Sequence, residues 1–384
     1  MGAHPQRGAL PRGFNSYRVI GKKQESAVIT SLLLATVEPA TVPTFIPGQF
    51  LTVRLAVEDG VTVLRNYSLS GDAQNASHLR ISVKRESAPA GRPDLPPGRG
   101  SNFLHDQVRV GDLLEIAGPT GAFILDQDSK RPVVLFSGGV GLTPMISMLH
   151  WLSRNSTQPV YFIHACEDGS VHAFRDEVLE LAGRRPGIHV HFCYRSPSPD
   201  DCERGAFHCQ GLISREILQT LLPLDDYEVY LCGPPPFMQA NWRLLRGLGI
   251  GAERIHYEFF GPATVLEEER DQAPRPAPSA AMAAAELASD LEGDRPTVQF
   301  LPSGTRVVWD PSCHSLLELA EQAGLAPAFN CRAGICNTCH VGLRQGQVEY
   351  FEEPLEAPAN GSVLLCCSRP IGTVTLDLSE SQPG

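Results

Sequence analysis

The sequence predicts three folded regions along one chain: an antiparallel β-barrel over residues 14–127, a doubly wound parallel α/β domain over 128–261, and an α+β domain over 297–384. The first region carries short β-rich runs separated by turn residues. The second alternates strand-like and helix-like segments, which is typical of a parallel sheet covered by helices. The third gathers five of the eleven cysteines between Cys331 and Cys367.

Length and composition agree with a folded chain of several domains. The 384 residues are enough for two or three domains, each able to bury a core without disulfides. No apolar run approaches the ~20 residues that a bilayer requires, and residues 1–12 lack the apolar centre of a secretory signal. We therefore expect a cytoplasmic protein, in which eleven cysteines indicate metal binding or chemistry rather than a disulfide framework.

Negative charge is concentrated near the end of the chain. The formal net charge is −11, of which residues 1–261 carry −1, residues 262–296 carry −5 and residues 297–384 carry −5. This distribution argues against a nucleic-acid ligand and favours a protein partner with a basic docking patch for the C-terminal region. Residues 262–296 are rich in Pro, Ala and Glu, and we expect them to form a flexible linker.

The expected strands of the barrel are short and regularly spaced, at residues 16–19, 29–36, 49–55, 61–69, 79–84 and 113–117. In the α/β domain we expect buried strands at residues 132–137, 159–165, 188–195, 227–232 and 255–260, with helices at 172–181 and 216–222. In the last domain we expect strands at residues 298–302, 306–309 and 374–378, with a helix at 315–323.

Three cysteines of the last domain have the spacing of an iron-sulfur site. Cys331, Cys336 and Cys339 form a Cys-x4-Cys-x2-Cys pattern, and the pair Cys366 and Cys367 follows after 26 further residues. Plant-type [2Fe-2S] clusters are held by four thiolates with this spacing. The alternative is a structural zinc site, which normally uses two Cys-x2-Cys hooks, whereas this segment has one.

This segment resembles plant-type ferredoxins, because residues 331–339 match their Cys-Arg-Ala-Gly-x-Cys-x-x-Cys loop. The run from Leu364 to Pro370 is similar to the closing Leu-x-Cys-x-x-x-Pro run of that family. The resemblance implies a β-grasp fold, with Cys367 as a buried neighbour of the site. It also implies the four cluster ligands, namely Cys331, Cys336, Cys339 and Cys366.

Small residues follow two of the buried strands in the α/β domain. Gly138-Gly139-Val140-Gly141 comes directly after one strand, and Pro144 then marks the start of a helix. Such a turn brings backbone N–H groups and a helix N-terminus against a diphosphate. Cys232-Gly233-Pro234 ends another strand of the same sheet. Because ligands of open α/β sheets bind at the carboxyl ends of the strands, both segments belong to one candidate dinucleotide site.

These two segments resemble the nicotinamide-dinucleotide domain of the ferredoxin-NADP reductase superfamily. In that superfamily, the positions of Thr143 and Cys232 flank the nicotinamide. The segment Tyr257 to Gly261 is similar to the end of flavohaemoglobin reductase domains. There, the positions of Glu258 and Phe260 lie at the flavin, and Phe260 would have to move aside when the nicotinamide binds.

The barrel carries a segment similar to the flavin signature of the same superfamily. In Arg65-Asn66-Tyr67-Ser68, the resemblance implies that Arg contacts phosphate, Tyr packs on the ring system and Ser reaches the reactive edge. Val83-Lys84 and Gly100-Ser101-Asn102, the latter at the expected start of a helix, fall where the family keeps its other flavin-phosphate contacts. The resemblance covers nearly the whole chain except residues 1–13 and the linker.

The identity of the two nucleotides follows from finer features. The run from Gly98 to His105 resembles the FAD-using flavohaemoglobin type more than the FMN-using phthalate dioxygenase reductase type, although the latter has the same domain order. We therefore expect FAD. Asp200 and Asp201 beside Arg195 would present mixed charge to the 2′-phosphate of NADPH, so we expect NADH and leave NADPH as the alternative.

The resemblances together imply an electron-transfer reductase. A nicotinamide releases two electrons as hydride and a [2Fe-2S] cluster accepts one, so a flavin between them would separate the pair. The expected partner is a separate oxygenase or demethylase component that docks on the acidic C-terminal end. The alternatives are a P450 or hybrid-cluster protein as acceptor, a self-contained NADH reductase of a small acceptor, and a redox sensor. A complete nicotinamide site argues against the sensor.

Overall fold

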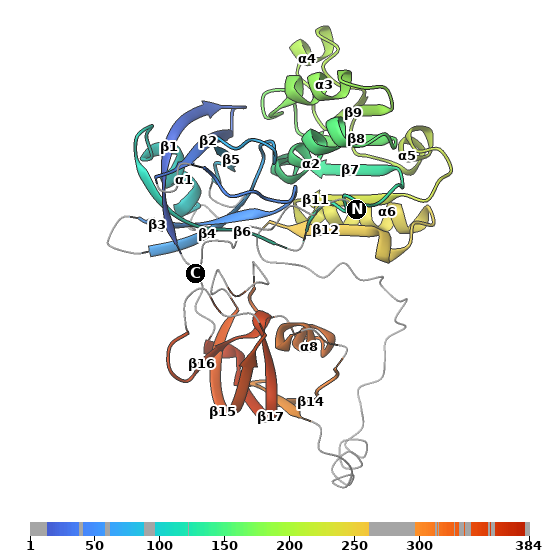
Figure 1. The fold of residues 1–384 in the computed structure, drawn as a ribbon. Helices are drawn as coiled ribbons and strands as arrows, with labels where there is room; N and C mark the ends of the chain where they lie inside the picture. The colour runs from blue at the N-terminus through green and yellow to red at the C-terminus, as the bar shows by residue number, and fades with distance from the viewer. Residues whose placement is uncertain are drawn as a thin grey trace, which may run out of the picture. The chain divides into compact units, whose positions relative to one another are not determined.

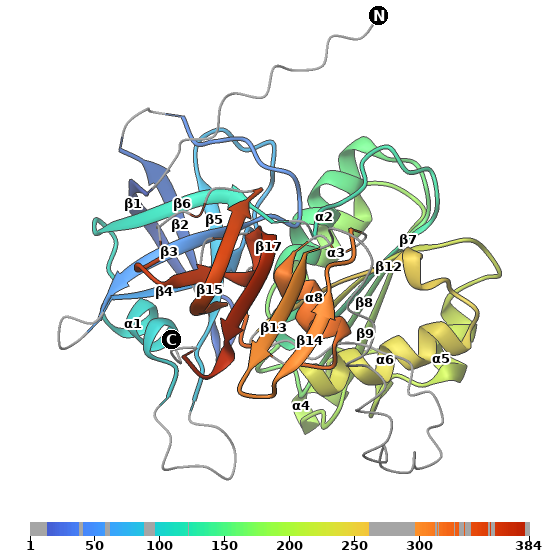
Figure 2. The same cartoon turned by 90° about the horizontal axis from the view of Figure 1, so that it is seen from below.

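A computed structural model gives the arrangement of the helices and strands (Figures 1 and 2). By internal contacts the chain divides into two compact units, Met1–Thr264 and Val265–Gly384. Apart from residue 296, the expected linker lies outside the described residues, as do Cys331 and Cys336. The structure describes residues 14–37, 41–57, 62–87, 97–121, 123–260, 296–311, 313, 315–325, 327–329, 334, 339–351, 354 and 358–380.

The first unit begins with a sheet of six antiparallel strands, and residues 14–121 are called the barrel lobe here. The strand order is β4-β3-β6-β1-β2-β5. An isolated bridge between Leu69 and Ile81 joins the end of β4 to β5 and so closes the sheet on itself. The elements are β1 (Asn15–Gln24), β2 (Ile29–Thr36), β3 (Phe50–Ala56), β4 (Thr62–Ser68), β5 (Leu79–Lys84), α1 (Arg99–Asp106) and β6 (Leu113–Thr120).

Strand β1 is longer than the sequence pattern predicts. Its pairing register with β2 shifts between Val19 and Gly21, which marks a β-bulge. A bulge interrupts the alternation of buried and exposed side chains, so the periodic signal stops there while the strand continues.

The second part of this unit, residues 123–260, is called the α/β lobe and holds a parallel sheet of order β10-β9-β8-β7-β11-β12. Every residue of β7 and β11 is buried, as expected for central strands covered on both faces. The strands are β7 (Val133–Gly138), β8 (Val160–Cys166), β9 (Ile188–Tyr194), β10 (Cys209–Gln210), β11 (Glu228–Gly233) and β12 (Ile255–Phe259). The helices are α2 (Leu142–Asn155), α3 (Arg175–Gly183), α4 (Pro199–Glu203), α5 (Arg215–Leu221) and α6 (Pro235–Gly247).

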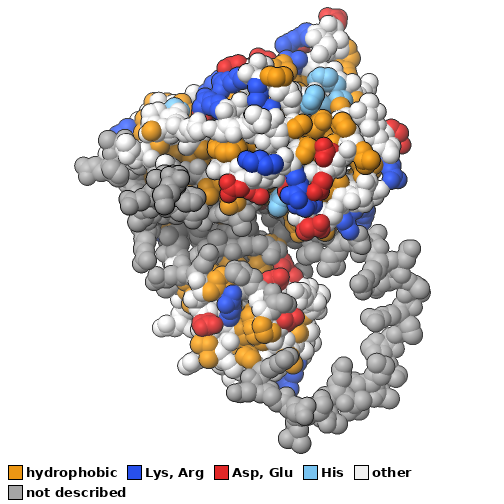
Figure 3. All heavy atoms as spheres, turned by 45° about the vertical axis from the view of Figure 1, so that its right-hand side comes forward, with side chains coloured by type: hydrophobic (Ala, Val, Ile, Leu, Met, Phe, Trp, Pro, Cys, Tyr) orange, Lys and Arg blue, Asp and Glu red, His pale blue; other side chains and the backbone are white. Residues whose placement is uncertain are grey.

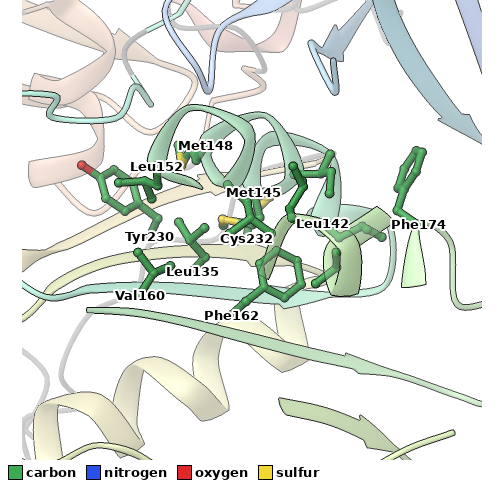
Figure 4. Close-up of a cluster of buried hydrophobic side chains, with 14 of the residues drawn as sticks. Leu135, Leu142, Met145, Met148, Leu152, Val160, Phe162, Phe174, Tyr230 and Cys232 are labelled. Carbon is green, nitrogen blue, oxygen red and sulfur yellow. The ribbon is translucent and has the colours of Figure 1, made fainter. Parts of the chain in front are cut away.

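Helices cover both faces of the parallel sheet, as a doubly wound fold requires. On one face, Leu135 of β7 packs with Met145 of α2 in a buried hydrophobic cluster (Figure 4). On the other face, Phe136 contacts Phe237 of α6 edge to face, with ring centroids 5.3 Å apart. The first cluster also includes Ile29 from the barrel lobe, so the two lobes share part of their core.

Helix α3 begins later than the sequence predicts. The expected helix started at His172, whereas α3 starts at Arg175. Phe174 precedes it with φ of 58°, in the left-handed region that non-glycine residues seldom adopt. This backbone conformation cannot continue a right-handed helix, and residue-type patterns do not reveal it.

The second unit holds a five-stranded mixed sheet and one described α-helix. The strand order is β14-β13-β17-β15-β16, in which β13 and β17 are parallel and the other pairs are antiparallel. Leu316 and Leu319 of the helix are buried, as are Val298 and Phe300 of the sheet. The elements are β13 (Thr297–Leu301), β14 (Thr305–Val308), α8 (Leu316–Gln322), β15 (His340–Tyr350), β16 (Ser362–Leu364) and β17 (Ser368–Asp377). The sequence pattern did not predict β15 and β16.

Surface charge on the first unit is mixed. On the face shown in Figure 3, acidic and basic side chains are interspersed among apolar ones. This agrees with the net charge of −1 that residues 1–261 carry.

Candidate functional site

The carboxyl ends of β7 and β11 meet where the strand order reverses. Because β8 lies on one side of β7 and β11 on the other, this edge is the topological switch point, where open α/β sheets bind ligands. β7 passes through a 3-10 turn directly into α2, so the N-terminus of that helix lies at the same edge. The structure therefore brings together the predicted dinucleotide residues Gly138, Gly139, Gly141, Cys232, Gly233 and Pro234.

Gly141 is required by the packing of this turn on β11. A Cβ atom at residue 141 would lie 2.2 Å from the carbonyl oxygen of Cys232, a backbone atom that cannot move aside. A glycine here lets the backbone approach β11 closely and leaves the turn free of a side chain that would obstruct a phosphate. The geometry fits a dinucleotide turn.

Thr143 and Cys232 are both buried beside this turn. The hydroxyl of Thr143 donates a hydrogen bond to the carbonyl of Val140 at 3.1 Å, so it stabilises the first turn of α2. The thiol of Cys232 belongs to the hydrophobic cluster beneath α2, near Met145 (Figure 4). Burial, and then the nearby Glu258, raise the pKa of this thiol well above its usual range, so Cys232 is protonated.

Glu258 is the most strongly perturbed carboxyl group at this edge. It lies on β12 beside Cys232 of β11. Burial raises the pKa of Glu258 to about 8, and the hydroxyl of Ser68 at the end of β4 lowers it only in part. Within the described residues, Ser68 Oγ and Glu258 Oε2 are buried atoms without a hydrogen-bond partner at normal distance. Two unsatisfied polar atoms, one from each lobe, indicate a place prepared for a polar ligand.

Phe260 follows β12 at the same edge. It is partly buried and packs against the hydrophobic cluster of the α/β lobe. Phe260 therefore lies at the same edge as Glu258, and its predicted position at the flavin stays a prediction.

Strand β4 and the first turn of α1 form the barrel side of the site. A Cβ atom at Gly100 would lie 2.9 Å from Cγ of Arg65 and 3.7 Å from the hydroxyl of Tyr67, so α1 packs directly on these two side chains. Asn66 accepts a hydrogen bond from Thr52 at 2.9 Å. Burial raises the pKa of Tyr67, which keeps its hydroxyl protonated.

The other predicted flavin-phosphate residues are engaged with the protein itself. Ser101 donates to the carbonyl of Gly98 at 3.1 Å, and the Asn102 amide donates to the carbonyls of Glu86 and Gly98 at 2.9 and 2.8 Å. Lys84 pairs with Glu86 at 3.1 Å, while Val83 is buried. Ser101 and Asn102 thus tie the end of β5 to α1.

The second unit brings two of the four predicted cluster ligands into buried positions. Cys339 and Cys366 are buried, and Cys367 beside them is fully enclosed. The backbone N–H of Gly334 donates to Cys366 Sγ at 3.3 Å, the kind of contact that iron-bound thiolates receive. The described residues contain no group of three or more His, Cys, Asp or Glu placed to hold a metal, and Cys331 and Cys336 lie outside them.

Two polar clusters were missed by the sequence analysis. Arg80, Glu177 and His150 form an ion-paired group where the two lobes meet, and nothing in the local sequence marks these residues. Asp201 forms a capping box with Ser198 at the start of α4 and also accepts from the backbone N–H of Gly169 at 3.1 Å. The Ser-x-x-Asp spacing could have predicted that cap.

The carboxylates of Asp200 and Asp201 are therefore both engaged by protein groups. Asp201 is buried with three hydrogen-bond donors around one oxygen, and Asp200 pairs with Arg204 at 3.1 Å. Both residues lie in α4, which follows β9, and their carboxylates are held by protein groups. No helix among the described residues is long and apolar enough to cross a membrane.

Sequence comparison identifies three families along the chain. The oxidoreductase FAD-binding domain matches residues 16–124, the oxidoreductase NAD-binding domain matches residues 135–242, and the 2Fe-2S iron-sulfur cluster binding domain matches residues 299–370. A flavohemoprotein of Bacillus anthracis is 43% identical over 258 residues, which cover 67% of this chain and 63% of that protein. The chain thus spans about 63% of the length of this relative.

Solved structures match both the first unit and nearly the whole chain. The flavohem-like FAD/NAD binding domain of nitric oxide dioxygenase from Vibrio cholerae is 36% identical with a TM-score of 0.58, covering 65% of this chain and 100% of that one. Phthalate dioxygenase reductase, described as a modular structure for electron transfer from pyridine nucleotides to [2Fe-2S], is 25% identical with a TM-score of 0.55. That match covers 95% of this chain and 98% of the reductase.

Proposed function

Because the chain belongs to the ferredoxin-NADP reductase family and carries a C-terminal 2Fe-2S domain, we propose that it passes electrons from NADH, one at a time, to a separate redox protein. It is an NAD(P)H-dependent oxidoreductase whose groups are FAD and a [2Fe-2S] cluster. The observation that carries the proposal is the meeting of the dinucleotide turn with Ser68 and Glu258 at one edge, on a chain that continues into a cluster domain.

A bound flavin would supply the chemistry that links a two-electron hydride donor to a one-electron cluster, which is why no acid-base pair or catalytic triad is needed. The residues of the chain itself would position the dinucleotide and the flavin. The turn at Gly141 and the N-terminus of α2 would hold the dinucleotide phosphates, and the packed Arg65 and Tyr67 would hold the flavin against the barrel. Phe260, which packs against the α/β cluster, would exclude water from the ring face of a bound flavin until the nicotinamide enters.

Ser68 and Glu258 would present polar atoms to the reactive edge of a bound flavin. With a pKa of about 8, Glu258 is mostly protonated at neutral pH and can donate a hydrogen bond rather than place a full charge there. The hydroxyl of Ser68, which lowers the pKa of Glu258 in part, is the second polar group at this edge. Thr143 and Cys232 shape the neighbouring nicotinamide pocket from beneath.

The cluster ligands are Cys331, Cys336, Cys339 and Cys366. The N–H donated by Gly334 to Cys366 supports Cys366 rather than Cys367 as the fourth ligand. A matched pair of variants tests this choice. Cys366→Ser should lose the iron and the visible charge-transfer bands, whereas Cys367→Ser should retain two irons per chain. Loss of iron in Cys367→Ser with retention in Cys366→Ser would reverse the assignment.

The proposed acceptor is an oxygenase or demethylase component with a basic docking patch. Support comes from the matched domain order of a dioxygenase reductase and from the net charge of −5 on residues 297–384. A P450 or hybrid-cluster protein is the alternative macromolecular acceptor. A self-contained reductase of a small acceptor is the alternative of another class, and steady NADH turnover with such an acceptor and no partner protein would favour it.

A visible spectrum of the anaerobic protein before and after NADH addition tests the core of the proposal. We expect flavin and cluster bands that both bleach. Colourless protein that holds zinc after anaerobic reconstitution would refute it.

Salt dependence tests the docking surface. Reduction of cytochrome c, a basic redox protein, should slow several-fold between ~50 and 300 mM salt, because screening weakens attraction between opposite charges. Ferricyanide reduction, which needs no docked protein, serves as the control and should lack this fall. A matching response in both assays contradicts an acidic docking face.

A further inference from the structure

The junction between the two lobes contains a partly buried cluster of three charged side chains. Arg80 of β5 donates to both carboxylate oxygens of Glu177 of α3, at 2.9 and 2.8 Å. His150 of α2 donates from Nε2 to Glu177 Oε1 at 2.6 Å. The exposed fractions of the Arg80, Glu177 and His150 side chains are 14%, 23% and 12%. A bidentate arginine pair with this burial fixes the relative position of β5 and α3.

The same arginine also holds the end of the strand that carries Ser68. Arg80 Nη2 donates a short hydrogen bond to the carbonyl of Ser70, two residues beyond Ser68. The backbone N–H of Ser70 in turn donates to the carbonyl of Arg80 at 2.9 Å. Arg80 therefore contacts the chain leaving β4 through both its backbone and its side chain.

A third contact joins Arg80 to the side chain of Phe174, the residue before α3. Its guanidinium carbon lies 4.7 Å from the centre of the Phe174 ring, which is a cation–π contact. Phe174, with φ of 58°, is the residue directly before α3, and it lies at one end of the hydrophobic cluster in Figure 4. A phenylalanine in this conformation persists only where surrounding contacts hold it.

We propose that Arg80 is a positioning residue for hydride transfer, because it joins the strand end beside Ser68 to helix α3 of the dinucleotide-binding lobe. This inference rests on the proposed function. Ser68 belongs to the barrel lobe, which holds the flavin, while the nicotinamide is held by the α/β lobe. The lobe junction therefore sets the distance between the donor carbon and the acceptor nitrogen.

Hydride transfer is sensitive to that distance. The carbon that loses hydride and the flavin nitrogen that gains it must come within ~3 to 3.5 Å, and a displacement of ~1 Å costs on the order of 100-fold in rate. A surface ion pair that merely stabilised the fold would not affect this distance selectively. The rate of flavin reduction at saturating NADH therefore separates the two roles.

The chain offers a matched control at the same junction. Arg154 of α2 pairs with Asp72 of the barrel lobe, so this contact also crosses between the lobes. It does not contact Ser70, and its arginine is 40% exposed. Arg154→Ala should remove a lobe-crossing ion pair and leave the strand end beside Ser68 in place.

The experiment uses the full-length, FAD-loaded protein in anaerobic stopped-flow. We expect Arg80→Ala to lower the saturating rate of flavin reduction by NADH at least tenfold per bound flavin. Arg80→Lys should lower it less, because a single amine keeps the charge and loses the bidentate geometry. Arg154→Ala should stay within twofold of the wild type. The primary deuterium isotope effect should rise in Arg80→Ala as transfer becomes rate-limiting.

Each alternative result is informative. Unchanged saturating rates per bound flavin in Arg80→Ala, or in Arg80→Lys and Glu177→Gln if Arg80→Ala does not fold, would overturn the inference. Equal losses in Arg80→Ala and Arg154→Ala would overturn it too, because any lobe-crossing pair would then have the same effect. A wild-type protein whose flavin NADH does not reduce would instead refute the proposed function.

Discussion

Two glutamates of the first unit have opposite pKa shifts. Glu177, at the lobe junction, is surrounded by Arg80 and His150. Burial raises its pKa, but hydrogen bonds from His150 and Arg80 outweigh burial and lower the pKa to about 2. Glu258, at the carboxyl edge of the sheet, has no cationic partner in the described residues, and burial raises its pKa to about 8.

The contrast teaches how to separate architecture from a binding site. Both carboxylate oxygens of Glu177 accept hydrogen bonds from protein donors, so its charge is compensated within the fold. A carboxyl with an enclosed oxygen that lacks a partner is costly unless something else enters and satisfies it. Glu258 fits the second case, and the predictions below test the difference between the two sites.

The largest effect is expected from Glu177→Ala. Removing this carboxylate leaves Arg80 and His150 partly buried without their shared partner, which should lower the free energy of unfolding by about 3 kcal/mol. Urea denaturation of the wild type and variant at neutral pH measures the change. A loss below about 0.5 kcal/mol, the range of an exposed pair, would contradict the structural role assigned to this cluster.

Acid should remove the contribution of Glu177. Its folded pKa of about 2 lies below the ordinary value of 4.5, so its stabilisation is complete above pH 4.5 and is lost as pH falls toward 2. The wild type should exceed Glu177→Gln by roughly 2 kcal/mol at pH 7, and this difference should shrink by pH 3. Urea midpoints at three pH values provide the measurement, and a constant difference would argue against an ionised Glu177.

Raising the pH should lower the folding stability of the flavin-free protein, because Glu258 then ionises in a buried position. Its folded pKa of about 8 lies above 4.5, so folding stability falls as pH rises between these values and the full penalty applies above pH 8. Glu258→Gln should therefore exceed the wild type by roughly 1 to 2 kcal/mol at pH 9, with little advantage near pH 5. If the wild type were the more stable protein at pH 9, Glu258 would have a partner after all.

The smallest effect is expected from His150→Ala. Glu177 keeps its two hydrogen bonds from Arg80, so losing the third donor should lower the free energy of unfolding by only about 1 kcal/mol. Urea midpoints of this variant and Glu177→Ala, compared side by side, rank the members of the cluster. A loss equal to that of Glu177→Ala would mean that His150, rather than Arg80, is the main partner.

Local patterns in the sequence predicted most strands and the glycine turn. Alternation and apolar runs identified β2, β5, β7 and β11. In each of these strands the pattern of apolar residues follows the burial of the side chains, with every residue of β7 and β11 buried. The fixed cysteine spacing predicted the iron-sulfur domain, which the family comparison confirms.

Other features depend on contacts between distant residues. Arg80 and Glu177 are separated by 97 positions, so no window of sequence relates them. The hydroxyl of Ser101 and the amide of Asn102 bind the protein backbone, a use that a motif cannot distinguish from phosphate binding. The left-handed Phe174 is fixed by packing rather than by its residue type.

The hydrophobic cluster beneath α2 has one further consequence. It contains Ile29 from β2 together with Phe123 and Leu125, which precede the first strand of the parallel sheet. Separating the barrel lobe from the α/β lobe would therefore expose apolar surface around Ile29 to water. The barrel lobe and the α/β lobe therefore depend on each other in folding. Evolutionary exchange of one lobe alone requires a new partner with a matching apolar contact surface.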